Sequence, residues 1–144
     1  MFYQQFHENA MHQMVRTMRV PVGRFNIPRT ELPQIKDQQD FLKWLNITQA
    51  VPYSTDVGPP TAVQPIQADL SHNKILGMMQ SNDAKIPSPF IISSDGYILD
   101  GHHRWASILN KTPHFRCTFR RVSLPMEKLL PLARKYPRAA YENV

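Results

Sequence analysis

The first half of the chain combines one strong helical pattern with shorter, less regular segments. Apolar residues recur every four positions in residues 2–18, which predicts an amphipathic helix. Residues 19–28 alternate apolar and polar side chains, as a short strand does, and end in a proline. Asp37 is a good N-cap for a helix that runs to Leu45. Three prolines and a glycine predict that residues 52–62 form a loop, either a binding lid or a linker.

The second half of the chain gives more regular signals. A strand-like run over residues 63–70 leads to Ser71, which suits the N-cap of a helix. The pair Asp95-Gly96 lies between two β-rich runs and predicts a hairpin turn. After the hairpin the pattern predicts a helix, an alternating strand and a last helix that contains Pro131, over residues 100–110, 114–122 and 126–136.

The order of these elements predicts a single compact α+β domain with a small mixed sheet flanked by helices. We expect residues 1–18 to form an N-terminal helical arm and residues 19–144 to form the domain. The arm either packs on the core or makes a contact in a homo-oligomer.

Composition and the single cysteine limit the class of protein. Hydrophobic residues make up 42% and charged residues 19% of the chain, as in folded globular proteins. No run approaches the roughly 18 apolar residues of a membrane span, and no secretory signal is visible. We therefore expect a cytoplasmic protein without a membrane partner. Cys117 lies on the same predicted apolar strand face as Phe115 and Phe119, which indicates a core thiol rather than a nucleophile.

The charge of the chain favours anionic partners. Lysines and arginines number 17 against 11 acidic residues, so the formal charge is +6. Such a charge suits nucleotides, nucleic acid or phosphorylated metabolites. The densest short cluster of basic residues is Arg116, Arg120 and Arg121, which are the candidate contacts to nucleic acid.

The stretch Asp100-Gly101-His102-His103-Arg104 carries the most specific chemistry. It ends a strand-like run and begins a helix, whose first backbone N–H groups have no partner within the helix. The glycine lets a ligand approach the backbone, Arg104 can fork onto phosphate oxygens, and the histidines add donors. These parts make a phosphate site. The alternative is that Asp100 caps the helix, Gly101 relieves strain and the histidines are solvated. Arg104 argues against this alternative, because a cation at a helix N-terminus is mildly unfavourable unless an anionic group lies there.

In its setting this stretch resembles a known family. Residues 63–122, with the hairpin and the glycine-led motif on the next helix, resemble the ParB/sulfiredoxin superfamily. Sulfiredoxins carry Gly-Cys-His-Arg at the matching place and ParB proteins carry Gly-Glu-Arg-Arg, and both bind nucleotide phosphates there. The Asp-Gly-His-His-Arg form is that of the free serine kinases and of many phage ParB-like proteins. The resemblance implies ATP or ADP with Mg²⁺ at Gly101–Arg104.

The sequence departs from the family at three places. The reactive cysteine of sulfiredoxins falls at His102, which excludes a sulfinic-acid reductase. The Glu-Arg-Arg form and room for a DNA-reading helix-turn-helix domain are both absent, which excludes a full partition protein. The kinases carry a Pro-His-Glu segment with a catalytic glutamate, and Gln67 stands at that position. Asp69, Asp100 or Glu31 would have to substitute as the base.

A proline-rich segment before the domain core is the candidate acceptor side of the pocket. Residues 28–35 resemble segments that precede this domain in phage-encoded members, which implies that Arg29 or Gln34 touches the substrate. The alternative is an irregular connection pinned by prolines.

Three functions follow from these observations. The leading hypothesis is a phosphotransferase that acts on a hydroxyl acceptor. In this hypothesis Asp100 orients the hydroxyl or contacts Mg²⁺. His102 and His103 donate hydrogen bonds to the phosphate, and one of them acts as an acid or base. The second hypothesis is a DNA-binding protein or a ParB-like nuclease. The third is an interaction protein that has the same fold and no catalysis. A phage-encoded protein would act in the host cytoplasm.

Overall fold

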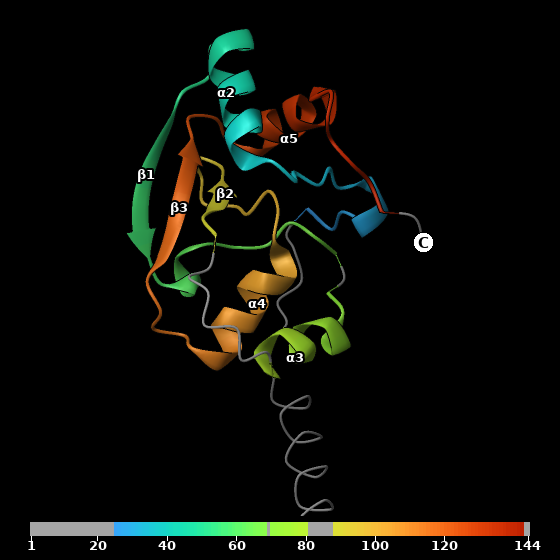
Figure 1. Cartoon of the computed structure of the whole chain (residues 1–144), viewed down its shortest axis with the longest axis vertical. Coiled ribbons are helices and arrows are strands. Elements are labelled where there is room, and N and C mark those ends of the chain that lie inside the picture. The colour runs from blue at the N-terminus through green and yellow to red at the C-terminus, as the bar shows by residue number, and fades with distance from the viewer. Residues whose placement is uncertain (1–24, 69, 81–87, 143–144) are drawn as a thin grey trace, which may run out of the picture.

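The computed structural model describes residues 25–68, 70–80 and 88–142 (Figure 1). In this part of the chain the elements are α2 (Gln38–Thr48), α3 (His72–Gln80), α4 (His102–Lys111), α5 (Met126–Lys135), the 3-10 helices η1 (Arg29–Glu31) and η2 (Pro60–Ala62), and the strands β1 (Tyr53–Gly58), β2 (Phe90–Ile92) and β3 (Cys117–Val122). The predicted α+β domain with a small mixed sheet and flanking helices is confirmed. The predicted helical arm and its oligomer contact lie outside the described residues.

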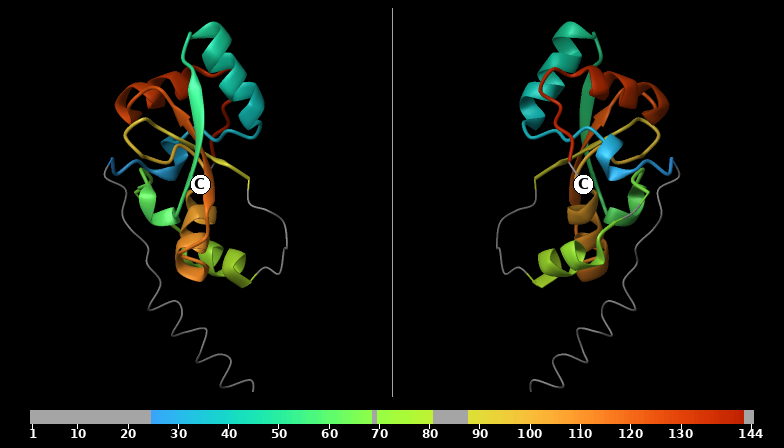
Figure 2. Two further views of the ribbon diagram at one scale, coloured as in Figure 1. Left: turned by 90° about the vertical axis from the view of Figure 1, so that its left-hand side faces the viewer. Right: turned by 90° about the vertical axis from the view of Figure 1, so that its right-hand side faces the viewer.

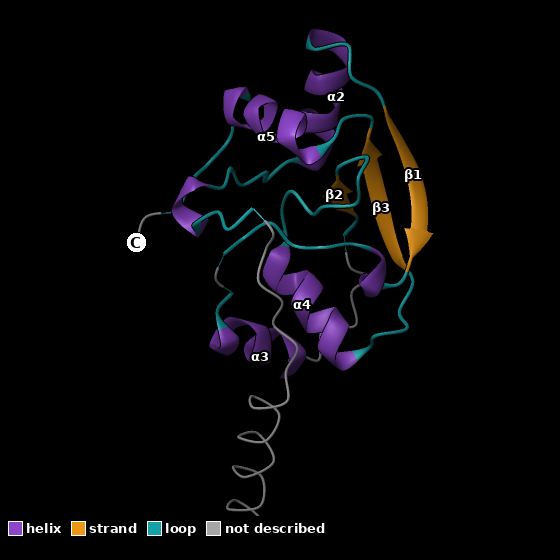
Figure 3. Ribbon diagram, turned by 180° about the vertical axis from the view of Figure 1, so that it is seen from behind, coloured by secondary structure: helices purple, strands orange, loops and turns teal. Residues whose placement is uncertain are grey.

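The sheet is mixed, in the order β1-β3-β2 (Figure 3). Strand β1 pairs antiparallel with β3, and Tyr53 lies opposite Val122. Strand β2 pairs parallel with β3, and Phe90 lies opposite Phe119. The parallel pair forms because the connection from β2 to β3 contains α4, which returns the chain to the same end of the sheet.

The sheet divides the buried side chains into two clusters. Successive strand residues point to opposite faces, so Ile91 and Val122 face a first cluster built with α2 and α5. Phe90 and Phe119 face a second cluster built with α3 and α4. Figures 1 and 2 show α2 and α5 at one end of the molecule and α3 and α4 at the other. The segment from Leu99 to Trp105 passes from the first cluster to the second.

Local signals explain where several elements begin and turn. The side chain of Asp37 accepts a hydrogen bond from the Asp40 amide at 3.0 Å, and that of Ser71 accepts from the Lys74 amide at 3.2 Å. Both residues cap helices as predicted. The predicted turn at Asp95-Gly96 is also present, and Gly96 has a φ of 84° that favours glycine.

Three predictions about strands are wrong. The predicted loop over residues 52–62 contains β1 and η2, because β1 is held by backbone pairing with β3 while its side chains are exposed. The predicted strand over residues 63–70 is irregular in its described part, and Gln64 and Gln67 make only isolated bridges. The described part of residues 19–28 likewise contributes one isolated bridge at Ile27.

The ends of two further predicted elements also differ. Phe115 is 38% exposed rather than buried, because β3 begins two residues later at Cys117. Cys117 itself is 2% exposed, which confirms the predicted core thiol. After the turn, Ile98 makes an isolated bridge with Ile92 instead of a full hairpin strand. None of the helices in the described ranges is long and apolar enough to cross a membrane.

Candidate functional site

The start of α4 is an uncapped helix end that requires glycine. Gly101 lies at the N-cap with φ 91° and ψ 27°, a left-handed conformation that disfavours other residues. No side chain caps the first amides of α4. A Cβ atom on Gly101 would lie 3.2 Å from the Arg104 guanidinium and 3.3 Å from the Phe90 ring. The N-terminus of α4 thus lacks a side chain at its N-cap, and such a helix end favours an anion.

Asp100 ties the start of α4 to the segment before α2. One carboxylate oxygen accepts from the Ile35 amide at 3.0 Å and the other accepts from the Gly101 amide at 2.9 Å. Burial raises the pKa of Asp100, and these two hydrogen bonds and the charge of Arg104 oppose that rise. Asp100 is thus not the N-cap of α4. It positions the glycine turn and lines the pocket at the start of α4.

The two histidines are buried and hold α4 against Ile66, Gln67 and Ser71, so the alternative that they are solvated is wrong. His102 is 4% exposed, and its Nε2 lies 3.0 Å from the Ile66 amide and 3.4 Å from the Gln67 amide. His103 is 6% exposed, and its Nε2 accepts from the Ser71 amide at 2.9 Å. Because the rings bond to different partners, the pair does not converge on one metal ion.

Both imidazole rings are neutral at physiological pH. Burial lowers the pKa of His102 to about 3, with smaller contributions from His103 and Arg29. Burial also lowers the pKa of His103 to about 4, with help from Arg29 and Lys74. The Nδ1 atom of His103 lies 3.3 Å from Nη1 of Arg29, so both ring nitrogens face N–H donors and a second proton is disfavoured. Neutral rings with such low pKa values suit positioning better than proton donation.

Arg104 lies over an aromatic ring beside the glycine. Its guanidinium carbon lies 4.2 Å from the centre of the Phe90 ring. One terminal nitrogen donates to the Pro89 carbonyl at 3.3 Å. Its Nε is buried and has no hydrogen-bond partner among the described residues. Burial lowers the pKa of Arg104 and Asp100 opposes this, so the side chain remains a cation with unused donor capacity.

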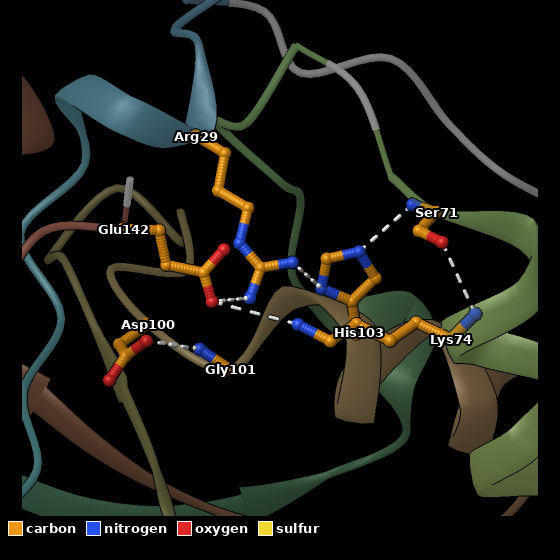
Figure 4. Close-up of polar contacts among 7 residues, drawn as sticks. All are labelled: Arg29, Ser71, Lys74, Asp100, Gly101, His103 and Glu142. Carbon is orange, nitrogen blue, oxygen red and sulfur yellow. Dashed lines mark hydrogen bonds and ion pairs between the residues drawn. The ribbon is translucent and has the colours of Figure 1, made fainter. Parts of the chain in front are cut away.

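Arg29, Lys74 and Glu142 form the opposite side of the site (Figure 4). Arg29 comes from η1 and lies against the ring of His103. Its guanidinium donates to the Glu142 carboxylate, and the Lys74 ammonium lies 3.6 Å from the same oxygen. Two cations from distant parts of the chain therefore meet at the second residue of α4.

The start of α4 lines a pocket of about 150 Å³ together with Arg29 and Lys74, and Glu142 is not among its lining residues. Its lining contains Lys74 and eight of the predicted site residues: Arg29, Gln34, Gln67, Asp100, Gly101, His102, His103 and Arg104. A second depression of about 620 Å³ shares Asp100, Gly101 and Arg104 and extends along residues 35–39 to Ser88 and Pro89. The start of α4 is thus the common wall of two hollows.

The remaining predicted residues lie elsewhere. Glu31 is exposed and is not part of the pocket lining, and Asp69 lies outside the described residues. Arg120 donates to the Thr55 hydroxyl at 2.6 Å, and Arg121 pairs with Asp56 at 3.0 Å on the β1–β3 side of the sheet. Arg116, just before β3, is exposed. The structure does not bring this arginine cluster to the pocket.

Sequence reasoning missed Lys74 and Glu142. Lys74 lies in the first turn of α3 and reaches the site because α3 packs on α4. Glu142 arrives because the Gln34 amide donates to the Ala140 carbonyl at 2.7 Å and the reverse bond is 3.2 Å. Both contacts depend on tertiary pairing between segments far apart in the sequence, for which no local spacing gives a signal.

Among the residues that the structure describes, no group of three or more histidine, cysteine or carboxylate side chains could hold a metal ion. Asp100 is the carboxylate at the start of α4, so a Mg²⁺ ion there would need most of its oxygen ligands from a bound phosphate. That donor set fits a metal that enters with a nucleotide rather than a protein-held ion.

Comparisons with protein-family models, curated proteins and solved structures gave no significant match to this chain. The resemblance to the ParB/sulfiredoxin superfamily therefore stays a prediction that rests on residues 63–122.

Proposed function

We propose that the chain binds ATP or ADP with Mg²⁺ at the start of α4 and transfers a phosphoryl group to a hydroxyl acceptor. The observation that carries the proposal is the left-handed Gly101, which opens an uncapped helix end into a pocket lined by Arg104 on one side and Arg29 and Lys74 on the other. A helix N-terminus with nearby cations is a common way to hold a phosphate group.

The two hollows differ in volume, and each suits a different part of the proposed ligands. Ligand pockets of drug-sized molecules measure roughly 300–1000 Å³. The pocket of about 150 Å³ suits a phosphate group or a small acceptor, whereas the depression of about 620 Å³ suits the nucleoside. Because Gly101 and Arg104 line both, a phosphate chain at the start of α4 would pass from the larger hollow to the smaller one.

The residues of the site would act mainly by position and charge. In the transfer, a bond from the acceptor oxygen to the terminal phosphorus forms and the bond from that phosphorus to the bridging oxygen breaks. ADP leaves when ATP is the donor, and AMP leaves when ADP is the donor. Arg104 and the α4 amides would neutralise the phosphate oxygens. Asp100 would hold Mg²⁺ or take the hydroxyl proton, since Gln67 has no carboxylate. His102 and His103 would keep α4 in place.

A nucleotide panel tests this proposal. Melting temperatures are measured with ATP, ADP and CTP, each at about 1 mM with Mg²⁺, and a nucleotide that binds raises the melting temperature. Arg104→Ala should abolish the rise, and Arg104→Lys should reduce it because lysine lacks the forked donors. Arg120→Ala is the matched control, since Arg120 lies outside the pocket. Unchanged melting temperatures with all three nucleotides would contradict the proposal.

A DNA-directed function is the second candidate, and one observation favours it. Lys43, Tyr53 and Arg120 line a depression of about 430 Å³ that adjoins the larger hollow through Gln38 and Pro89. Basic and aromatic side chains together suit single-stranded nucleic acid. Binding to an oligonucleotide that falls steeply with salt and is lost in Arg120→Ala would support this function. If neither nucleotide nor DNA binds, the third hypothesis, an interaction protein without catalysis, is favoured.

A further inference from the structure

The cations of the pocket already hold an anion of the chain itself. Figure 4 shows one oxygen of the Glu142 carboxylate joined to both the Arg29 guanidinium and the Lys74 ammonium, beside the start of α4. One oxygen of Glu142 contacts both cations, the guanidinium by a hydrogen bond and the ammonium at 3.6 Å. Arg29 and Lys74 line the pocket, so the carboxylate neutralises the charge that a ligand would meet there.

The C-terminal segment is attached to the wall of the pocket by backbone bonds. Ala140 pairs with Gln34 in an antiparallel bridge, with N–O distances of 2.7 and 3.2 Å. Gln34 also lines the pocket, and its side chain forms a hydrogen bond with Glu142. The segment before α2 thus serves both as pocket wall and as the support for the tail that carries Glu142.

Glu142 is a carboxylate under the conditions in which a phosphate would bind. Desolvation raises the pKa of Glu142, but the hydrogen bond with Gln34 and the charges of Arg29 and Lys74 outweigh it, so the pKa is below its ordinary value. The Glu142 side chain is 38% exposed and its contacts are ionic. A carboxylate at such a partly exposed place can exchange with a more strongly charged anion, because an exposed ion pair contributes little free energy.

We propose that Glu142 is an internal competitor for the anion pocket, and that a phosphate ligand displaces its carboxylate from Arg29 and Lys74 on binding. This inference rests on the proposed phosphate site. It assigns to the C-terminal segment a regulatory contact, since any partner or modification that withdraws residues 139–142 would raise the affinity of the pocket for phosphate.

Inorganic pyrophosphate is the probe, because it carries the anionic groups without a nucleoside. Its affinity is measured by isothermal titration with the full chain and with Glu142→Gln, which keeps the size and removes the charge. We expect Glu142→Gln to bind pyrophosphate about fivefold more tightly, as expected when a partly exposed ion-pair partner is removed. Asp56→Asn is the matched control, because Asp56 also pairs with an arginine at 3.0 Å but lies on the sheet.

The outcomes separate this inference from the proposed function. Equal affinities of the full chain and Glu142→Gln would overturn the competitor role and leave the phosphate site standing. Failure of both proteins to bind pyrophosphate would overturn the phosphate site and the inference with it. A gain in Asp56→Asn equal to that in Glu142→Gln would also overturn the inference, because it would show an effect of net charge alone.

Discussion

Acid should destabilise this protein through its buried histidines, and His102 allows the size of the effect to be worked out. Its Nε2 faces two backbone amides, and burial lowers the pKa from 6.5 to about 3. Between these two values the unfolded chain binds a proton on His102 and the folded chain does not. Stability is therefore complete above pH 6.5 and is lost as the pH falls toward 3.

The expected loss at pH 5 follows from the distance to the unfolded pKa. One pKa unit corresponds to about 1.4 kcal/mol, so His102 alone should lower the free energy of unfolding by about 2 kcal/mol between pH 7.5 and pH 5. The lowered pKa of His103 acts in the same direction. Asp100 acts in the opposite direction at lower pH, because its raised pKa lets the folded state take up a proton first.

Urea unfolding followed by tryptophan fluorescence at pH 7.5 and pH 5 measures this loss. His102→Gln keeps a side-chain acceptor for the two amides and cannot titrate, so it should lose stability at pH 7.5 but show a smaller change between the two pH values. His114→Gln is the control, since His114 is exposed. A free energy of unfolding that is the same at both pH values in the wild type, or an equal loss in His102→Gln, would refute the reasoning.

Three further changes test the local structure, each by urea unfolding. Gly101→Ala should cost about 1–2 kcal/mol from the left-handed conformation and should also weaken pyrophosphate binding, because the new Cβ displaces Arg104. Trp105→Phe removes the buried bond from Nε1 to the Pro60 carbonyl at 2.7 Å and should cost about 1–3 kcal/mol. Asp37→Ala removes the cap of α2 and should cost about 1 kcal/mol, whereas Asp56→Ala, an exposed carboxylate outside any helix, should cost less. Any of the first three that leaves stability unchanged contradicts the role given to that contact.

The elements that sequence reasoning found are those fixed by local chemistry. The caps at Asp37 and Ser71 and the turn at Asp95-Gly96 are visible within a few residues, and so is the apolar face of α4. Strand β1 was missed because its side chains are exposed, so it shows no apolar alternation and exists only through pairing with β3. The strand-like run over residues 63–70 predicts a strand, yet in its described part Val63, Ile66 and Leu70 are buried in the two clusters without regular strand pairing.

The residues of the candidate site likewise fall into those with a local sequence signal and those without one. Gly101 and Arg104 were found because a glycine before a helix has a conformational meaning that does not depend on the rest of the fold. The histidines are predicted phosphate contacts, but the sequence does not predict their burial, since it depends on the amides of Ile66, Gln67 and Ser71. Lys74 and Glu142 have no local signal, because packing of α3 on α4 and the bridge at Ala140 bring them to the site.

The division of the core into two clusters has a mechanical consequence for the pocket. Arg29 precedes Leu32 of the first cluster, and Lys74 precedes Ile75 of the second. The segment between Leu99 and Trp105 crosses from one cluster to the other. An anion that contacts both Arg29 and Lys74 therefore links the two clusters and stabilises their packing against each other. Slower hydrogen exchange in both α3, which carries Lys74, and α5, which packs in the first cluster, would be its signature.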